Sequence, residues 1–205
     1  MTSEAEWIEE ESFRIIEGFV KDIPYPEREV VKRVVHTTAD PAFAELLVIG
    51  EGAVERGVEA LRAGRDVITD VTMVGSGINR SLLSGLGGEV RCYIGDEDVR
   101  AYSAEKGITR ARAAYRLHKG DLDGNIVAVG NAPTALSELV RLHREDGIRP
   151  ALVVGVPVGF VGAAEAKEEL LEAGLPSIVV RGRRGGSAVA AAITNALLAL
   201  AGEMP

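Results

Sequence analysis

Arg33 and His36 are the two residues whose types and spacing most directly suggest chemistry. They stand three positions apart in "PEREVVKRVVH", residues 26–36, whose valines recur at helical spacing. Residues three apart on a helix share a face, so a fixed cation lies beside a group that titrates near neutrality. Such a face could bind an anion and move a proton. A histidine at a helix C-terminus can also simply offset the helix dipole, and spacing alone favours this simpler role.

Residues 181–187, "RGRRGGS", form a second candidate site. Three arginines precede two glycines at the start of an alanine-rich helix. The free N–H groups and the dipole of a helix N-terminus favour an anion, and arginine binds carboxylate or phosphate through paired hydrogen bonds. We therefore consider Arg181, Gly186 and Ser187 as anion ligands. The alternative is an ordinary solvated basic loop whose glycines let the helix pack closely on the sheet.

Four further polar residues could contact a ligand. Ser12 could face it, or bond back to a carbonyl one turn earlier on its helix. Thr38 supplies a hydroxyl where the second helix ends. Asp70, in "DVITDV", could orient a ligand or cap the turn that follows. Arg110 comes directly after Thr109, which is a suitable helix N-cap, and spacing alone makes it a surface arginine of an amphipathic helix.

Several kinds of site are not indicated by the sequence. The glycine spacing of "GVPVGFVG" differs from that of a dinucleotide-binding loop, and no phosphate-binding lysine motif is present. No nucleophile–histidine arrangement or metal-ligand cluster stands out, so we expect neither a cofactor nor a metal. The single cysteine, Cys92, excludes an internal disulfide and is expected to be buried and inert. His118 and His143 are expected to be solvated on helix surfaces.

The composition of the 205 residues limits the class of partner. A net charge of -8 and 4% aromatic residues argue against nucleic acid and anionic lipid. The N-terminus is acidic and lacks an apolar signal core, and no uninterrupted apolar stretch has the length of a membrane span. We therefore expect a cytoplasmic protein that contacts no membrane.

Five short segments rich in valine and isoleucine are expected to be the strands that position these residues. Strands without polar alternation are buried on both faces, and their alternation with helices implies a parallel sheet covered by helices. We expect one domain, residues 1–205, to which residues 1–40 add two helices. Ser3 and Glu6 form a capping-box pattern at the first helix. The expected strand segments are "DVITDV", "EVRCYI", "NIVAVG", "ALVVGV" and "SIVVRG".

Four of these strands are followed by glycine-rich or polar loops. Ligands of such sheets lie beyond the carboxyl ends of the strands. The loop at residues 155–162 places Gly155, Pro157, Gly159 and Gly162 at one turn, without an acid, a base or a nucleophile. We interpret it as a smooth pocket wall, where a ligand can lie against backbone.

Motifs over nearly the whole chain resemble those of the precorrin-8X methylmutases and their cobalt-precorrin-8 counterparts, enzymes of corrin-ring synthesis on the way to vitamin B12. The resemblance implies a three-layer α/β/α fold with a parallel, Rossmann-like five-stranded sheet. It also implies a homodimer with active sites at the subunit interface. The segments that carry it are "EESFRII", "RVVH", "TDVTMVGSGI", "TR", "GNAPTAL", "GVPVGFVGAAEAKEEL" and "RGRRGGSAVAAAITNAL".

The implied reaction is an intramolecular migration of a methyl group from C11 to C12 of a tetrapyrrole substrate. No cofactor is implied, and any cobalt belongs to the substrate. His36 matches the family's catalytic histidine, whose implied role is proton transfer to and from the macrocycle. Ser12, Arg33 and Arg110 match substrate contacts. The many acetate and propionate groups of the substrate suit local arginines in an acidic protein.

Two other functions are open at this point. A non-catalytic carrier of corrinoid intermediates would keep the pocket and the arginines but would not require His36. A nucleotide-dependent oxidoreductase of similar fold would bind a nicotinamide cofactor. The motifs do not distinguish a metal-free substrate from one that contains cobalt.

Overall fold

The fold is built on one six-stranded sheet, seen in a computed structural model that describes residues 4–203. The strand order is β1-β6-β5-β4-β2-β3, and every neighbouring pair is parallel except β1 with β6. The strands are β1 (Leu47–Ile49), β2 (Val67–Thr69), β3 (Val90–Arg91), β4 (Ile126–Val129), β5 (Leu152–Gly155) and β6 (Ser177–Val180).

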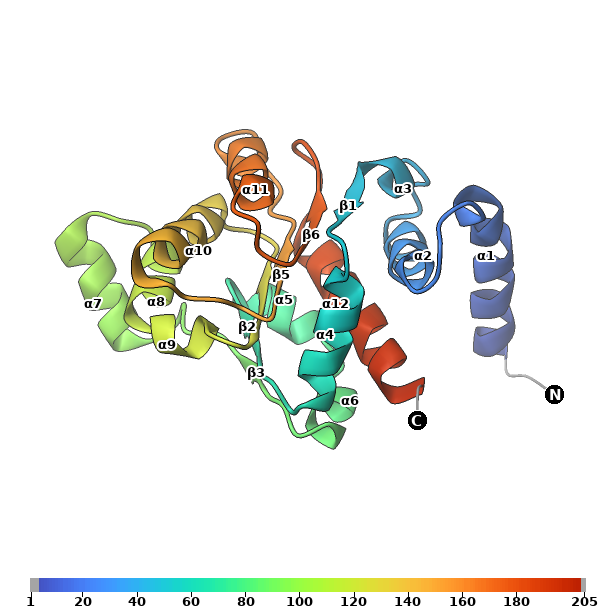
Figure 1. The fold of residues 1–205 in the computed structure, drawn as a ribbon, viewed down its shortest axis with the longest axis horizontal. Coiled ribbons are helices and arrows are strands. Elements are labelled where there is room, and N and C mark those ends of the chain that lie inside the picture. The colour runs from blue at the N-terminus through green and yellow to red at the C-terminus, as the bar shows by residue number, and fades with distance from the viewer. Residues whose placement is uncertain (1–3, 204–205) are drawn as a thin grey trace.

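Helices cover both faces of this sheet (Figure 1). They are α1 (Glu4–Val20), α2 (Glu27–Thr38), α3 (Phe43–Leu46), α4 (Ala53–Arg62), α5 (Thr72–Gly77), α6 (Arg80–Gly85), α7 (Glu97–Lys106), α8 (Arg110–Leu117), α9 (Lys119–Leu122), α10 (Pro133–Asp146), α11 (Ala163–Glu172) and α12 (Ser187–Glu203). Among these described helices, none is both long and apolar enough to cross a membrane.

Alternate residues of the central strands face two separate hydrophobic cores. In β4, Ile126 and Ala128 pack into the core that includes α2, α4 and α12. Val127 and Val129 pack into the core that includes α8, α10 and α11. Because side chains alternate along a strand, a fully apolar strand requires a helical layer on each face. The predicted three-layer α/β/α arrangement is therefore confirmed.

The number and direction of the strands differ from the prediction of five parallel strands. All five predicted strands are present, but β1 is an additional edge strand that runs antiparallel, with Leu47 opposite Val180 and Ile49 opposite Ile178. Its three residues are only half-buried and directly follow the one-turn helix α3. A run this short, without a preceding turn signal, is not distinguishable from a helix end in the sequence.

The two N-terminal helices pack on one side of the molecule. α2 contacts α12, and α1 packs on the outside of α2 (Figure 1). The valine stripe predicted for α2 is buried and consists of Val30, Val31, Val34 and Val35. Of the predicted capping box at α1, Ser3 lies outside the described residues.

Candidate active site

His36 lies near the end of α2, where its ring stacks on Phe13 of α1. The ring centroids are 4.9 Å apart and the planes meet at 26°. The buried valine stripe of α2 faces the core and leaves His36 half-buried at its border. Phe13 was not singled out by the sequence, because an aromatic residue on an amphipathic helix is an ordinary core residue. The stacking fixes the position of the imidazole.

Ser12 and His36 line the same pocket, which has a volume of about 300 Å³. The Ser12 hydroxyl donates a hydrogen bond to the Ile8 carbonyl at 2.7 Å, and its oxygen keeps the capacity to accept. This hydrogen bond is one of the two possibilities that the sequence left open, and contact of Ser12 with a ligand stays a prediction. The other lining residues are mainly apolar: Ile15, Ile16, Phe19, Val35, Ala39 and Pro41. An apolar pocket with one imidazole and one hydroxyl suits the proton chemistry of a large, partly flat ligand.

Arg33 contacts the same phenylalanine but faces a neighbouring hollow. Its guanidinium lies 4.9 Å from the centre of the Phe13 ring, and its Nη1 is 3.0 Å from Glu9 Oε1. The hollow, of about 160 Å³, is also lined by Lys32 and by residues of α12. The structure therefore places Arg33 beside the His36 pocket and not among the residues that line it.

The end of α2 is joined to the loop of residues 181–187. α2 ends at Thr38, whose hydroxyl donates to the Val34 carbonyl at 2.9 Å, and is followed by its C-cap Ala39, whose φ of 52° is left-handed. Asp40 Oδ2 then accepts a hydrogen bond from Arg184 Nη1 at 2.7 Å. His36 and the arginine loop are thus held together by a contact four residues beyond the histidine.

The backbone of the arginine loop is fixed against the loop at residues 156–162. Gly186 N–H donates to the Val156 carbonyl at 2.9 Å, and Gly159 N–H donates to the Arg183 carbonyl at 3.1 Å. A Cβ on Gly185 would lie 2.2 Å from the Val156 oxygen, so only glycine fits there. These glycines therefore allow close packing of the backbone. This agrees with the alternative interpretation of the loop, in which its glycines serve packing and not an anion.

The arginine side chains of this loop border an open hollow of about 420 Å³. Arg181, Arg183 and Arg184 line it, and Ser187 begins α12 next to them. Arg181 is exposed, with its Nε 3.8 Å from Glu168 Oε1, and Arg183 lies over the Phe160 ring at 5.6 Å. Binding of an anion by Arg181, Gly186 and Ser187 stays a prediction.

The loop at residues 155–162 is not the smooth wall expected from its glycines. Gly155 and Pro157 are buried, and a Cβ on Gly155 would lie 2.5 Å from Leu170 Cδ2. Gly155 is therefore needed for the packing of α11 on β5 and has no surface for a ligand. The loop instead exposes large apolar side chains, with Phe160 86% and Val161 89% exposed. Glycine spacing alone could not separate helix packing from ligand approach.

Asp70 caps the turn after β4 and not the turn that directly follows it in the sequence, so the local role considered for it was wrong. Its carboxylate is 1% exposed and accepts backbone N–H groups from Gly130 at 3.0 Å, Asn131 at 2.8 Å and Ala132 at 2.6 Å. Burial raises the pKa of Asp70, and these hydrogen bonds oppose the rise. The carboxylate thus holds the loop between β4 and α10 from inside the protein.

Replacing Asp70 by asparagine is expected to lower the free energy of unfolding by about 1–3 kcal/mol. The asparagine amide has only one oxygen to accept the three backbone N–H groups. Its NH2 group is itself a donor, so at least one buried N–H loses its acceptor. For a chain of this size we expect a fall of about 2–4 °C in melting temperature for each kcal/mol. Thermal unfolding measures this effect. Asp123→Asn, which removes the charge from a single exposed acceptor of the Arg149 N–H, is the control and should change little. Equal melting temperatures for Asp70→Asn and wild type would contradict the prediction.

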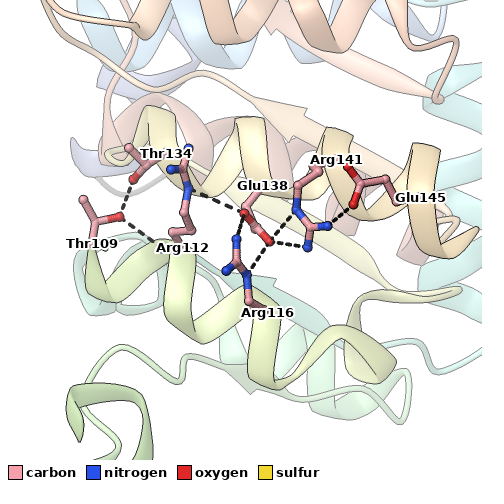
Figure 2. Close-up of polar contacts among 7 residues, drawn as sticks. All are labelled: Thr109, Arg112, Arg116, Thr134, Glu138, Arg141 and Glu145. Carbon is pink, nitrogen blue, oxygen red and sulfur yellow. Dashed lines mark hydrogen bonds and ion pairs between the residues drawn. The ribbon is translucent and has the colours of Figure 1, made fainter. Parts of the chain in front are cut away.

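Arg110 begins α8, a helix that is fixed to α10 at its first turn (Figure 2). The predicted N-cap is confirmed, because the Thr109 hydroxyl accepts the Arg112 N–H at 3.3 Å. Thr109 Oγ1 also lies 2.6 Å from Thr134 Oγ1 at the start of α10. Arg110 itself is exposed. Because α8 and α2 cover opposite faces of the sheet, one chain does not bring Arg110 into the pocket of His36.

A buried carboxylate clamps α8 onto α10. Glu138 of α10 is 2% exposed and accepts two hydrogen bonds from Arg116 of α8, both at 2.9 Å (Figure 2). Arg141 donates to it at 3.0 and 2.7 Å, and Arg112 Nε lies 3.5 Å away. Burial acts to raise the pKa of Glu138, but the hydrogen bonds from Arg116 and Arg141 outweigh it, so the pKa is lowered. This clamp fixes the later part of α8 to α10, while Thr109 and Thr134 connect the first turn, where Arg110 lies.

Two expectations about other residues, those for the histidines and for the cysteine, were wrong. His118 and His143 are half-buried rather than fully solvated. His118 stacks on Tyr93 at 3.9 Å between centroids, and His143 Nδ1 lies 2.8 Å from the Ile148 carbonyl oxygen. Cys92 is half-buried rather than buried. Ligand atoms of Asp96, Asp98 and His118 lie within 4.8 Å of one another and could hold a metal ion, and the expectation that no metal is bound stays a prediction. The members of this group come from a loop, a helix and a helix end, so sequence spacing does not indicate it.

Comparison with known proteins identifies the family to which the chain belongs. Residues 7–200 match the family described as precorrin-8X methylmutase. The chain belongs to the precorrin-8X methylmutase family. A cobalt-precorrin-8 methylmutase of Salmonella typhimurium is 45% identical over 93% of both chains, and a precorrin-8X methylmutase of Pseudomonas aeruginosa is 41% identical over 88% of both. The predicted resemblance is thereby confirmed.

A solved structure of the family has the same fold. The precorrin-8X methylmutase of Thermus thermophilus is 44% identical, with a TM-score of 0.87, and the match covers 96% of this chain and 98% of that one. The match to the family includes α1 and α2, which form the pocket of His36. Methylmutases are isomerases, so the chain belongs to a family of enzymes. Members named for the cobalt substrate and for the metal-free substrate match at similar identity, and similarity alone does not separate the two.

Proposed function

We propose that this protein is a corrin-ring methylmutase of cobalamin biosynthesis. It moves a methyl group from C11 to C12 of precorrin-8X or cobalt-precorrin-8 and gives hydrogenobyrinate or cobyrinate. The observation that carries the proposal is His36, held by Phe13 at the edge of an apolar pocket in a chain that matches the family over residues 7–200. The whole chain works as one unit in the cytoplasm, with residues 1–40 contributing part of the site.

The chemistry that this site must supply is modest. The migrating methyl group is already on the macrocycle, so neither a methyl donor nor a nucleophile is required, and we propose that the enzyme works without a cofactor. His36 transfers a proton to and from the macrocycle as a general acid–base. The apolar side chains around it exclude water from the reacting face. Ser12, Thr38 and the arginines hold the peripheral carboxylates.

The test is conversion of precorrin-8X and of cobalt-precorrin-8 by the purified protein. Absorption spectroscopy should show a change of chromophore, and mass spectrometry should show a product of the same mass as the substrate. Adding a methyl donor should have no effect, because the reaction is intramolecular. Comparing the two rates also shows which form of the substrate is preferred. A product of altered mass, or a need for a methyl donor, would refute the isomerase.

Arg33→Ala and Arg110→Ala are expected to weaken substrate binding more than they alter folding. Each removes a charged hydrogen bond to a substrate carboxylate, worth roughly 1.5–3 kcal/mol, which is about 10–150-fold in Kd. Equilibrium titration and thermal unfolding measure the two effects separately. Arg144→Ala, at an exposed position of α10, is the control and should bind like the wild type. Unchanged affinity in both variants would remove these residues from the substrate site.

We propose a homodimer with active sites at the subunit interface. Large apolar side chains that a partner could cover are exposed on α1, namely Trp7, Ile8, Ile15 and Phe19. The position of Arg110 also supports a dimer. Within one chain α8 does not reach the His36 pocket, but the α8 of a second subunit could. Light scattering of the full chain should give the mass of a dimer. A monomer at working concentration would contradict this assembly.

A further inference from the structure

Lys167 is a fully buried lysine beneath the arginine loop. It lies on α11 with 0% exposure, on the face that also buries Ala163, Ala166 and Leu170. Its Nζ donates a hydrogen bond to the Arg184 carbonyl at 2.8 Å. Within residues 4–203, no carboxylate forms an ion pair with it, and the neighbouring Glu168 acts on it only from a distance. Lysine is among the residues that are least often buried without a partner.

The position of this ammonium group is costly for the protein. Moving a cation out of water without a counter-charge is unfavourable, and the group responds by a shift of its pKa. Burial lowers the pKa of Lys167 to about 8, so the amine is mainly protonated at neutral pH. A methionine would fill the same space without that cost. The charge and the single hydrogen bond therefore indicate that Lys167 has a role beyond the packing of α11.

The carbonyl that Lys167 binds belongs to the residue that ties the arginine loop to α2. Arg184 is held from inside through its carbonyl by Lys167 and from outside through its guanidinium by Asp40. The next two residues, Gly185 and Gly186, lie against the Val156 carbonyl. Lys167 thus supports the backbone at the point where three arginines and the start of α12 meet.

We propose that Lys167 is a positioning residue that fixes the arginine loop and places a buried positive charge beneath it for the carboxylates of the substrate. This inference rests on the proposed function, since it assigns the arginine loop to the carboxylates of the corrin substrate. A carboxylate on the outer side of the loop supplies the counter-charge that the buried ammonium lacks. Substrate binding and protonation of Lys167 then favour each other.

A pH dependence of binding follows from this coupling. Deprotonation of Lys167 between pH 7 and 9.5 removes the buried charge and weakens binding. The charged groups around it are Glu168 on its own helix, Arg181 and Arg184 on the loop, and Asp40 after α2. Arginines and carboxylates keep their charges in this range. Each unit by which binding raises the lysine pKa corresponds to a tenfold change in affinity.

The experiment is an absorption titration of the full chain with hydrogenobyrinate, the proposed product, at pH values from 7 to 9.5. The variants are Lys167→Met, which keeps the shape without charge or donor, and Lys167→Gln, which keeps a donor without charge. Lys106→Met, at an exposed lysine, is the control. Calorimetry in two buffers of different ionisation enthalpy counts the protons taken up on binding. Turnover of precorrin-8X is measured in parallel.

We expect the affinity of the wild type to fall about tenfold between pH 7 and 9.5, with proton uptake on binding near pH 8. Lys167→Met and Lys167→Gln should bind more weakly at pH 7 and show a flat profile, with kcat within a few-fold of wild type because His36 is intact. A wild type that turns over but has a flat profile and takes up no proton overturns the role of Lys167, even if Lys167→Met fails to fold. A wild type that binds hydrogenobyrinate at no pH and converts nothing overturns the proposed function, and this proposal with it.

Discussion

Replacing His36 by asparagine is expected to slow turnover by about 10²–10⁴-fold, the range that general acid–base catalysis typically supplies. Asparagine retains polarity and some hydrogen bonding but cannot titrate, so the proton transfer is lost while the pocket keeps its shape. Folding should be nearly unaffected, because the buried valine stripe of α2 does not include His36. The contribution of a histidine to a helix C-terminus is only about 0.3–1 kcal/mol.

The measurement is the single-turnover rate, together with substrate binding and melting temperature. Thr37→Ala is the matched control, because Thr37 is exposed on the same turn and its hydroxyl bonds only to the Arg33 carbonyl. A His36→Asn variant with a normal rate would remove the histidine from the mechanism. A wild type that binds the substrate without converting it would favour the non-catalytic carrier, which does not require His36.

Replacing Glu138 by glutamine is expected to destabilise the fold by about 3 kcal/mol. Removing one partner of a buried ion pair typically costs about 3–5 kcal/mol, because the remaining charges lose their counter-ion. The arginines around Glu138 are about one-third exposed, so water lessens the cost and the lower end applies. A fall in melting temperature of about 6–12 °C should follow.

Acid should abolish this difference. Since folding lowers the pKa of Glu138, its stabilising contribution is complete above the ordinary value of 4.5 and is lost as the pH falls through the lowered pKa. Thermal unfolding of wild type and Glu138→Gln at neutral and acidic pH measures this. Glu145→Gln is the control, because Glu145 is 60% exposed and pairs only with Arg141 on its own helix. It should cost under about 1 kcal/mol. Similar melting temperatures for the variants at Glu138 and Glu145 would show that the clamp is not a source of stability.

The layers of the fold were predictable because they depend on patterns that lie within single segments. The apolar strands and the valine stripe of α2 specify their burial on their own, and the N-cap at Thr109 is a local signal. The edge strand β1 was missed because its three residues become a strand only through pairing with β6. The directions of side chains at the site depend on such long-range pairing as well.

The two buried charges that lie on helices, Glu138 and Lys167, could have been recognised from the sequence pattern. Glu138 stands among Ala135, Leu139 and Leu142, and Lys167 among Ala163, Ala166 and Leu170. In both helices the charged residue occupies a core position of the apolar stripe at spacings of three, four and seven. Their partners, Arg116 and the Arg184 carbonyl, lie 22 and 17 positions away in the sequence. Spacing therefore marks the buried charge but does not identify what it binds.

The pairing of β1 with β6 and of α2 with α12 has a consequence for the order in which the chain can fold during synthesis. The segment of α2 and β1, which carries His36, is made well before β6 and α12, against which it docks. At about 5–20 residues per second, roughly 8–30 s separate the emergence of β1 from that of α12. During that interval the valine stripe of α2 lacks the cover that α12 provides. His36 therefore reaches its final position only after α12 has been synthesised.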